Sequence, residues 1–263
     1  MKLAARIEGV GVVGPGLASW HEGREVLAGR AAFVSKPTVL PVPEALPATE
    51  RRRAGKSVKL SLAAGLEAAR EAGRPARDFV AIFASSSGDG ETCHSICETL
   101  ASDDRSISPT RFHNSVHNAP SGYWGIATGA MRPADCLGAY DASFGAGLLE
   151  GLVRLAADAT QPVLVIAYDA PYPEPLNGAR PMDDAFAAAL ALAAPASGRG
   201  PLIEIELARG AAIPMEDAAL EAMRRGIPAA RSLPLLTLLA RGASGETTLD
   251  YLGAVTLRAR LSA

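Results

Sequence analysis

Short apolar runs alternate with amphipathic stretches along this chain, and the alternation constrains the fold more than any other feature of the sequence. The apolar runs at 78–84, 134–139 and 162–168 have the length of buried strands. The stretches 49–73 and 142–158 carry apolar side chains at helical spacing. Strands that alternate with helices in this way predict an α/β architecture with a mostly parallel sheet.

The rest of the chain is divided by glycine and proline into further elements. We expect, in chain order, a strand at 3–13, a helix at 19–30, a helix at 91–100, a loop at 106–118, a helix at 121–129, a strand pair at 186–194 and 201–207 joined by a hairpin-like turn at 197–200, helices at 215–225 and 232–241, and one closing strand at 247–261.

Composition excludes several classes of protein. With 263 residues, of which 48% are hydrophobic, the chain can bury a sizeable core. A formal net charge of −2 and only 5% aromatic residues argue against nucleic-acid binding. No apolar run approaches the roughly 20 residues of a membrane span, and the first residues make a poor signal peptide. We therefore expect a cytoplasmic protein without a membrane span.

The stretch Gly9 to Gly14 matches the dinucleotide-binding fingerprint literally, at the end of a predicted strand. That chemistry also needs a helix that opens at the third glycine and an acidic residue about 20 positions further on. Here Pro15 and Gly16 follow at once, and no acidic residue occurs between Val26 and Pro43. We interpret the motif as a strand that ends in a tight turn, with no nucleotide cofactor.

A second candidate is a zinc site formed by cysteine and histidine side chains at helical or loop positions. Its possible ligands are Cys93, His94, Cys97, His113 and His117. Structural zinc sites usually use a C-x2-C pair, whereas these cysteines are four residues apart. We expect ordinary packed or exposed side chains and no metal.

The only basic cluster comprises Arg51, Arg52, Arg53, Lys56 and Lys59. One interpretation is the solvated start of a helix. The other is a docking patch for an acidic acyl carrier protein or for a partner subunit. The sequence favours the first and leaves the second open.

Three segments together resemble the β-ketoacyl synthases of the thiolase superfamily. They are Ile7–Pro15 with Leu27–Arg30 after it, the helix through 62–73 with the strand 80–84, and Cys136–Ala146. The last is similar to the family's nucleophile segment, which is a strand, a sharp turn that carries cysteine, and a buried helix. In this register Asp141 holds the cysteine position, and Cys136 lies upstream on the strand.

The loop Ser115–Ala119 resembles a subgroup of shortened, chain-length-factor-like proteins of aryl-polyene-type pathways. The resemblance spans roughly residues 5–195. It implies a thiolase-like layered αβα fold whose N-terminal half, 1–195, is largely complete. The remaining segment, 196–263, would be a truncated C-terminal half packed on the same core, reduced to one helical layer and two or three strands.

The residue inventory bears on catalysis in this family. A ketosynthase uses a thiolate nucleophile, two histidines downstream of it and a nearby lysine. Here the last histidine is His117 and the last lysine is Lys59, so neither can follow position 141. The resemblance therefore implies a non-catalytic, cofactor-free partner of an active β-ketoacyl synthase, in a heterodimer that elongates polyketide or fatty-acid-type chains and meets acyl carrier protein through that partner.

Two alternatives remain open. One is a homodimeric module that binds acyl groups or carrier protein. The other is a decarboxylase or acyltransferase that uses Asp141 with His113 or His117. Asp141 itself is interpreted chiefly as the N-cap of the helix that begins at Ala142, and Ser143 has no downstream histidine to activate it.

The loop around His117 is also a candidate interface. The residues that could contact a partner there are Phe112, His117, Asn118, Tyr123 and Trp124. Large aromatic side chains often anchor protein–protein contacts. The aromatic residues among them could equally belong to the core.

Overall fold

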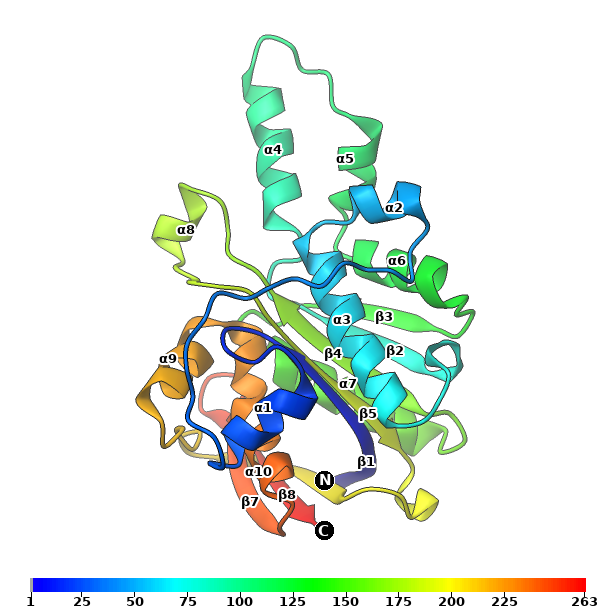
Figure 1. The fold of residues 1–263 in the computed structure, drawn as a ribbon, viewed down its shortest axis with the longest axis vertical. Helices are drawn as coiled ribbons and strands as arrows, with labels where there is room; N and C mark the ends of the chain where they lie inside the picture. The colour runs from blue at the N-terminus through cyan, green and yellow to red at the C-terminus, as the bar shows by residue number, and fades with distance from the viewer. Residues whose placement is uncertain (1) are drawn as a thin grey trace.

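A single eight-stranded sheet organises the computed structural model, which describes residues 2–263. Its strand order is β3-β2-β4-β5-β1-β6-β8-β7 (Figure 1). The strands are β1 (Lys2–Val13), β2 (Val80–Ala84), β3 (Ala134–Leu137), β4 (Val163–Asp169), β5 (Phe186–Ala193), β6 (Leu202–Arg209), β7 (Gly245–Asp250) and β8 (Val255–Ser262).

Ten α-helices and three short 3-10 helices occur in the described residues. The α-helices are α1 (Trp20–Leu27), α2 (Ala48–Arg53), α3 (Lys56–Glu71), α4 (Gly90–Ala101), α5 (Pro109–Asn114), α6 (Ala119–Thr128), α7 (Ser143–Ala157), α8 (Leu176–Ala179), α9 (Ala218–Gly226) and α10 (Leu233–Arg241). The 3-10 helices are η1 (Ala76–Asp78), η2 (Pro195–Ser197) and η3 (Pro228–Ser232).

Helices cover both faces of the sheet and enclose two apolar cores. One core lies between the sheet and the helices α3 and α6. The other lies between the opposite face and the helices α7, α1, α9 and α10. This is the layered αβα arrangement predicted from the sequence. Helices α4 and α5 form an arm that projects from this body (Figure 1).

The sheet is not mostly parallel, so that prediction is wrong. Only the pairs β2–β3 and β2–β4 are parallel, and the other five are antiparallel. Parallel strands require a crossover connection. Helices α4, α5 and α6 lie in the connection from β2 to β3, and α7 connects β3 to β4, which lies on the other side of β2. Between β4 and β5 the chain returns through a loop with only the short α8, so these strands run antiparallel.

The predicted strand pair at 186–194 and 201–207 forms both strands but does not pair them. β1 lies between them and is antiparallel to each. The turn after β5 arches over β1, where the Arg6 guanidinium donates to the Gly200 carbonyl at 2.9 Å. A local turn signal cannot reveal that a third strand enters between its two arms.

Three other element predictions need correction. The helix at 49–73 is two helices, α2 and α3, because Ala54 and Gly55 between them are extended. The closing strand at 247–261 is a hairpin, β7–β8, that turns at 251–254. The loop at 106–118 contains the helix α5, which begins at Pro109 after Ser108. Proline in the first helical turn is a start signal that the interpretation overlooked.

The glycine motif of β1 is explained by the close approach of α3. A Cβ atom on Gly9 would overlap the Ala68 carbonyl oxygen, and one on Gly11 would overlap that of Ala64. Two carboxylates of the same helix also reach β1, where the Val12 amide donates to Glu67 at 2.9 Å and the Val10 amide donates to Glu71. Gly9 and Gly11 of the fingerprint therefore serve helix–strand packing, whereas a Cβ atom on Gly14 would overlap the Phe186 ring.

The C-terminal segment has a helical layer on one face only. Ile203, Ile205 and Leu257 point into the core with α7, α9 and α10. The alternate positions, on the other face, are charged and pair across strands, as in Lys2–Glu204 at 2.6 Å and Arg258–Glu206 at 2.9 Å. This agrees with the predicted truncation of the C-terminal half. Because β6–β8 continue the sheet of β1, the division at residue 195 stays a prediction.

None of the helices in residues 2–263 combines the length and the apolar character needed to cross a lipid bilayer.

The packing of α3 on β1 makes a direct stability prediction. We expect Gly11→Ala to lower the free energy of unfolding by about 2 kcal/mol or more, because the new methyl group must displace helix backbone. Gly122→Ala is the matched control, since Gly122 lies in α6 with no heavy atom near its Cβ position. That control should raise stability by about 0.5–1 kcal/mol. Urea unfolding measures both, and equal effects would contradict the packing account.

Candidate functional site

The candidate site lies where the parallel strands β2, β3 and β4 end. Carboxyl ends of neighbouring parallel strands meet at one edge of a sheet, and ligand sites of α/β proteins lie there. β3 passes into a turn over 138–142, and α7 begins at Ser143. Tyr140, in this turn, has a φ of +53°. The predicted sequence of strand, sharp turn and buried helix is therefore confirmed.

Ser143 completes the turn with its side chain. Its hydroxyl donates to the Tyr140 carbonyl at 2.7 Å and accepts from the Ala139 amide at 3.0 Å. Helix α7 then packs closely on the sheet, because a Cβ atom on Gly147 would lie 2.8 Å from the Ala84 methyl group. Ser143 is thus buried and fully engaged as a structural residue of the turn.

Asp141 does not cap α7, so that prediction is wrong. The residue before the helix is Ala142, and no side chain caps the helix there. The Asp141 carboxylate instead accepts from two guanidinium groups, Arg180 at 2.7 Å through Oδ1 and Arg231 at 3.1 Å through Oδ2. Charge-assisted bonds to two arginines outcompete a backbone amide for the same oxygens.

The ion pairs continue beyond Asp141. Arg231 also faces Asp250 at 3.7 Å, and Asp250 pairs with Arg224. Arg224 binds Glu221 through two hydrogen bonds of 2.7 Å, which lower the pKa of Glu221 to about 2. This chain of charges, which we call the Asp141 network, connects the turn to the C-terminal helices.

An open cavity of about 520 Å³ borders the network. Its walls are the turn, the loop after β6 and the end of β7. The charged side chains that line it are Asp141, Arg224, Arg231 and Asp250. Since the Asp141 network pairs these charges with one another, the cavity has no strong excess of either sign.

Asp169 organises the adjoining loops from the end of β4. Its Oδ1 atom accepts from the Ser86 amide at 2.8 Å, the Ser86 hydroxyl at 2.7 Å and the Ser85 hydroxyl at 3.2 Å. Oδ2 accepts no hydrogen bond of standard geometry, although the Ala229 amide lies close enough to favour the charged form. Complete burial outweighs these contacts and raises the pKa of Asp169 to about 6.

His113 and His117, the histidines considered as partners of Asp141, are placed elsewhere by their contacts. His117 packs beside the end of β2, with Nε2 3.3 Å from the Ser85 carbonyl oxygen. His113 is exposed on α5. Among the described residues no hydrogen bond or ion pair joins Asp141 to either histidine.

The candidate interface residues divide into two groups. Phe112 and Asn118 are exposed, His117 is half-buried, and a role in an interface stays a prediction for them. Tyr123 and Trp124 lie in the core instead: the Tyr123 hydroxyl donates to Asn114 at 3.2 Å, and Trp124 packs edge-to-face on Phe83. Their position on the inner face of α6 rules out direct contact with a partner.

The cysteine and histidine candidates do not converge. Cys93 and Cys97 are exposed on α4, and the Cys93 thiol faces the Ser115 carbonyl oxygen at 3.6 Å. Within residues 2–263, no three side chains of the metal-binding types come together in a way that could hold an ion.

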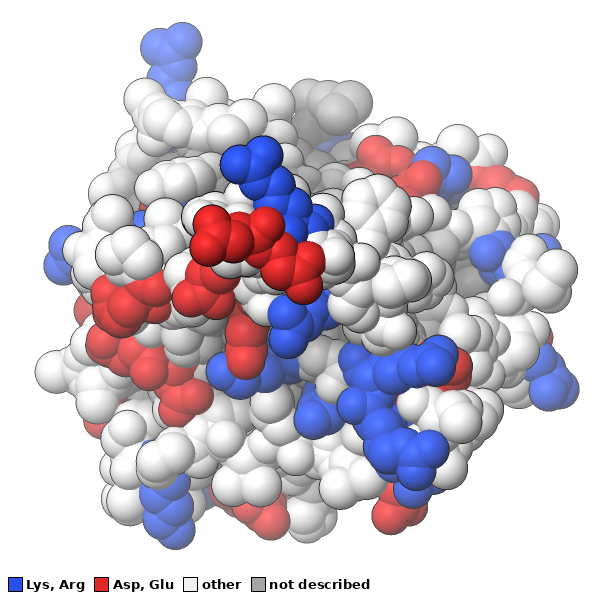
Figure 2. All heavy atoms as spheres, turned by 90° about the horizontal axis from the view of Figure 1, so that it is seen from above, with Lys and Arg blue, Asp and Glu red and all other residues white. Residues whose placement is uncertain are grey.

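The basic cluster is partly paired. Arg51 donates to the Leu46 carbonyl at 3.0 Å, Arg53 pairs with Glu50 at 3.3 Å, and Lys56 pairs with Glu91 at 3.0 Å. Figure 2 views the molecule from the end that carries the arm, and there basic and acidic groups lie side by side. The docking role of this cluster stays a prediction.

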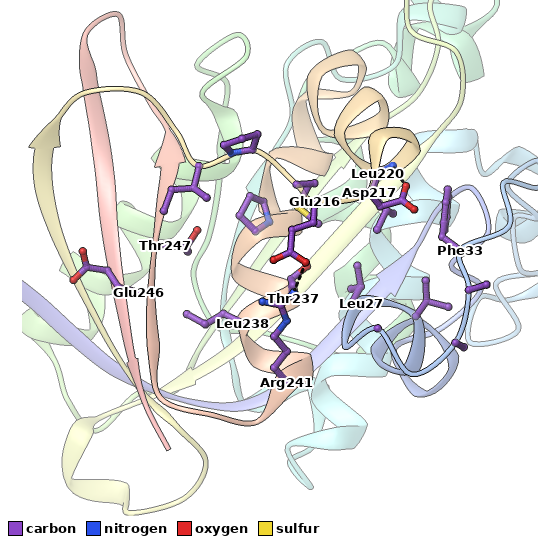
Figure 3. Close-up of a pocket in the computed structure, with 18 residues that line it drawn as sticks. Leu27, Phe33, Glu216, Asp217, Leu220, Thr237, Leu238, Arg241, Glu246 and Thr247 are labelled. Atoms are coloured by element: carbon purple, nitrogen blue, oxygen red, sulfur yellow. Dashed lines mark hydrogen bonds and ion pairs between the residues drawn. The ribbon is translucent and has the colours of Figure 1, made fainter.

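A second cavity, of about 290 Å³, lies between α1, α9 and α10 (Figure 3). Apolar side chains such as Leu27, Phe33 and Leu238 form much of its wall, and Glu216 pairs with Arg241 at 3.2 Å beside it. It shares no lining residue with the cavity at Asp141. Its lining contains neither cysteine nor histidine, so we assign it no chemistry.

The sequence pattern of the β-ketoacyl synthase N-terminal domain matches residues 20–248. The chain belongs to the β-ketoacyl synthase family. The match extends well past residue 195, where the motif-based resemblance ends. No curated protein sequence gives a significant match.

Solved structures share the fold at low sequence identity. A chain in the complex of the ketosynthase ApeO with its chain length factor ApeC from Xenorhabdus doucetiae aligns with a TM-score of 0.74 and 23% identity, over 98% of this chain and 99% of that one. A chain of the ishigamide ketosynthase/chain length factor aligns with a TM-score of 0.72 and 13% identity, over 98% and 99%.

Another β-ketoacyl synthase, from Burkholderia phymatum, shows how far this chain is shortened. It aligns with a TM-score of 0.59 and 16% identity, and the alignment covers 87% of this chain but 71% of that one. The short length is therefore shared with chains of the complexes above and not with this synthase.

Three site residues escaped the sequence interpretation. Asp169 directly follows the predicted strand 162–168, and a carboxylate at the end of a buried strand is a signal that could have found it. Arg180 and Arg231 lie 39 and 90 residues from Asp141 in the chain, in segments without a motif. Only the fold brings them to the turn.

The raised pKa of Asp169 predicts a pH-dependent stability. A carboxyl whose pKa is higher in the folded state stabilises the fold when protonated, and this contribution is lost as pH rises from about 4 to 6. Asp169→Asn keeps the acceptor oxygen without the charge. Between pH 4 and pH 7, the free energy of unfolding of this variant should therefore rise by roughly 2–3 kcal/mol relative to that of wild type.

Urea unfolding of both proteins at several pH values measures this gain. Asp158→Asn is a control expected to show no pH dependence in this range, because hydrogen bonds from Thr160 and Gln161 lower the pKa of that exposed carboxyl and its contribution to stability is therefore lost only below about pH 4. A constant difference between wild type and Asp169→Asn across this range would show that Asp169 does not titrate there.

Proposed function

We propose that this chain is the non-catalytic, chain-length-factor-like subunit of a heterodimer with an active β-ketoacyl synthase. In that complex it would influence the polyketide or fatty-acid-type chain that the partner elongates. The observation that carries the proposal is the pairing of Asp141, at the nucleophile position implied by the family resemblance, with two arginines. A carboxylate neutralised by two guanidinium groups is a poor nucleophile, and no histidine or lysine follows it in the chain.

The open edge of β3 supports a partner at this end of the sheet. β3 is the outermost strand, and its inner side is used by β2, where the Ala81 amide donates to Pro133 and the Ser85 amide to Leu137. Successive residues of a strand alternate in direction, so the amides and carbonyls of Ala134 and Cys136 face outward. Such an edge pairs readily with a strand of another chain.

Apolar side chains flank this edge on both layers. Met131 before β3 is almost fully exposed, and Ile126 of α6 and Val153 of α7 are each a little under half exposed. Both helices contact β3. An open strand between exposed apolar side chains is typical of a protein interface. Exposed Phe112, on α5 of the arm, and exposed Val116, just after α5, are further apolar side chains that could extend this interface.

The alignment with chains of ketosynthase–chain length factor complexes supports the choice of partner. The ApeO–ApeC structure and the ishigamide structure each contain a ketosynthase and a chain length factor, and this chain aligns over nearly its whole length in both. We infer that acyl carrier protein reaches the complex through the active subunit.

An affinity purification from native cells tests the pairing. We expect the tagged chain to retain one protein at a near one-to-one ratio. Its intact mass and sequence should identify a β-ketoacyl synthase with the cysteine and both histidines. Recovery of the tagged chain alone or only as its own dimer would contradict the pairing and favour the homodimeric module or the enzyme that uses Asp141.

The β3 edge offers a sharper test with a matched pair of variants. Cys136→Pro removes one outward amide and adds a ring on the open side, whereas Cys136→Ala keeps the amide. Because proline is tolerated on the outer side of an edge strand, the variant should remain folded. We expect Cys136→Pro to weaken binding of the purified partner roughly tenfold or more, and Cys136→Ala to bind as wild type. Equal affinities by calorimetry would place the interface elsewhere.

A further inference from the structure

Tyr140 is unusual for a tyrosine in two respects, its backbone conformation and its exposure. Among residues 2–263 it is the only non-glycine residue with a positive φ, at +53°. That conformation is less favourable for a residue with a Cβ atom than for glycine. The residue is also 62% exposed, so burial in the core does not compensate for the unfavourable backbone conformation. An exposed aromatic in a strained turn indicates a role outside the isolated chain.

The Asp141 network holds this aromatic ring in one orientation. The Arg180 guanidinium lies 3.7 Å from the centre of the Tyr140 ring. Arg180 is fixed in turn by Asp141 at 2.7 Å and by the Tyr172 hydroxyl at 2.8 Å. A side chain that is rigid before binding loses little entropy when a partner covers it.

The turn continues directly from the open edge strand. Tyr140 is three residues beyond Leu137, the last residue of β3, which limits its distance to about 10 Å. An interface of ordinary size buries about 800 Å² on each partner and extends further than that from its centre. Tyr140 therefore lies within the reach of an interface of ordinary size centred on β3.

We propose that Tyr140 is an anchor residue of the interface, whose ring, stacked on Arg180, packs against the active β-ketoacyl synthase subunit. This inference rests on the proposed function and adds to it a named contact. It also assigns a purpose to Asp141, which keeps Arg180 beneath the ring in place of any chemistry at the nucleophile position.

Tyr140→Gly separates the anchor from the fold. Glycine adopts the positive φ without strain, so stability should hold or rise while the ring is lost. With the β-ketoacyl synthase that co-purifies with wild type, we expect calorimetry to show about 30-fold weaker binding, as for an interface hot spot. Tyr140→Phe keeps the stacked ring and should bind within about threefold of wild type. Arg180→Gln removes the stacking and should give an intermediate loss.

Leu207→Ala is the matched surface control. Leu207 is 54% exposed on β6, and four strands separate β6 from β3 in the sheet. At about 4.8 Å for each strand spacing, it lies over 20 Å from the edge and should not affect binding.

Each outcome decides the proposal. If Tyr140→Gly binds as wild type while Cys136→Pro does not bind, the anchor is overturned and the heterodimer stands. If Tyr140→Phe loses as much as Tyr140→Gly, the hydroxyl and not the stacked ring makes the contact, and the anchor as proposed is wrong. If wild type retains no β-ketoacyl synthase, the proposed function fails first and the anchor with it.

Discussion

A carboxylate between two arginines determines what this site can do. Asp141 stands in the strand–turn–helix segment where the family resemblance places a cysteine, and its two oxygens accept from Arg180 and Arg231. The pairing joins three segments that are distant in sequence: the β3–α7 turn, the loop after β4 and the 3-10 helix before α10. Both oxygens of the Asp141 carboxylate accept hydrogen bonds in this pairing. Asp141 therefore connects loops at the position where the resemblance places a reactive thiolate. The turn resembles the family's nucleophile segment in shape, with a carboxylate at the position that the resemblance assigns to cysteine.

The fold around the site is a shortened form of the β-ketoacyl synthase fold. Helix α3 lies so close to β1 that two positions must be glycine, and the first half of the sheet is thereby covered on both faces. In the second half one face is solvated, and alternating charges pair across its strands in place of a helical layer. Cross-strand ion pairs of this kind keep an uncovered sheet soluble while the opposite face supplies the core.

Local patterns in the sequence predicted most of the elements and the layered fold, because each depends on residues close together in the chain. The buried strands β2 and β4 and the helix α7 follow directly from apolar periodicity. Which strands are neighbours in the sheet was harder to predict, because no signal in 186–207 shows that β1 enters between β5 and β6. The site followed the same rule. Position 141 was found from its motif, but its role was not, since Arg180 and Arg231 come from distant segments without a pattern of their own.

Mass spectrometry of the separate subunits, after the purified complex is incubated with acyl-loaded carrier protein, tests the central claim most directly. If this chain is non-catalytic, the acyl adduct should appear on the partner's cysteine alone, and the mass of this chain should stay unchanged. An acyl adduct on this chain that disappears in Asp141→Ala would contradict the account and favour an enzyme that uses that carboxylate.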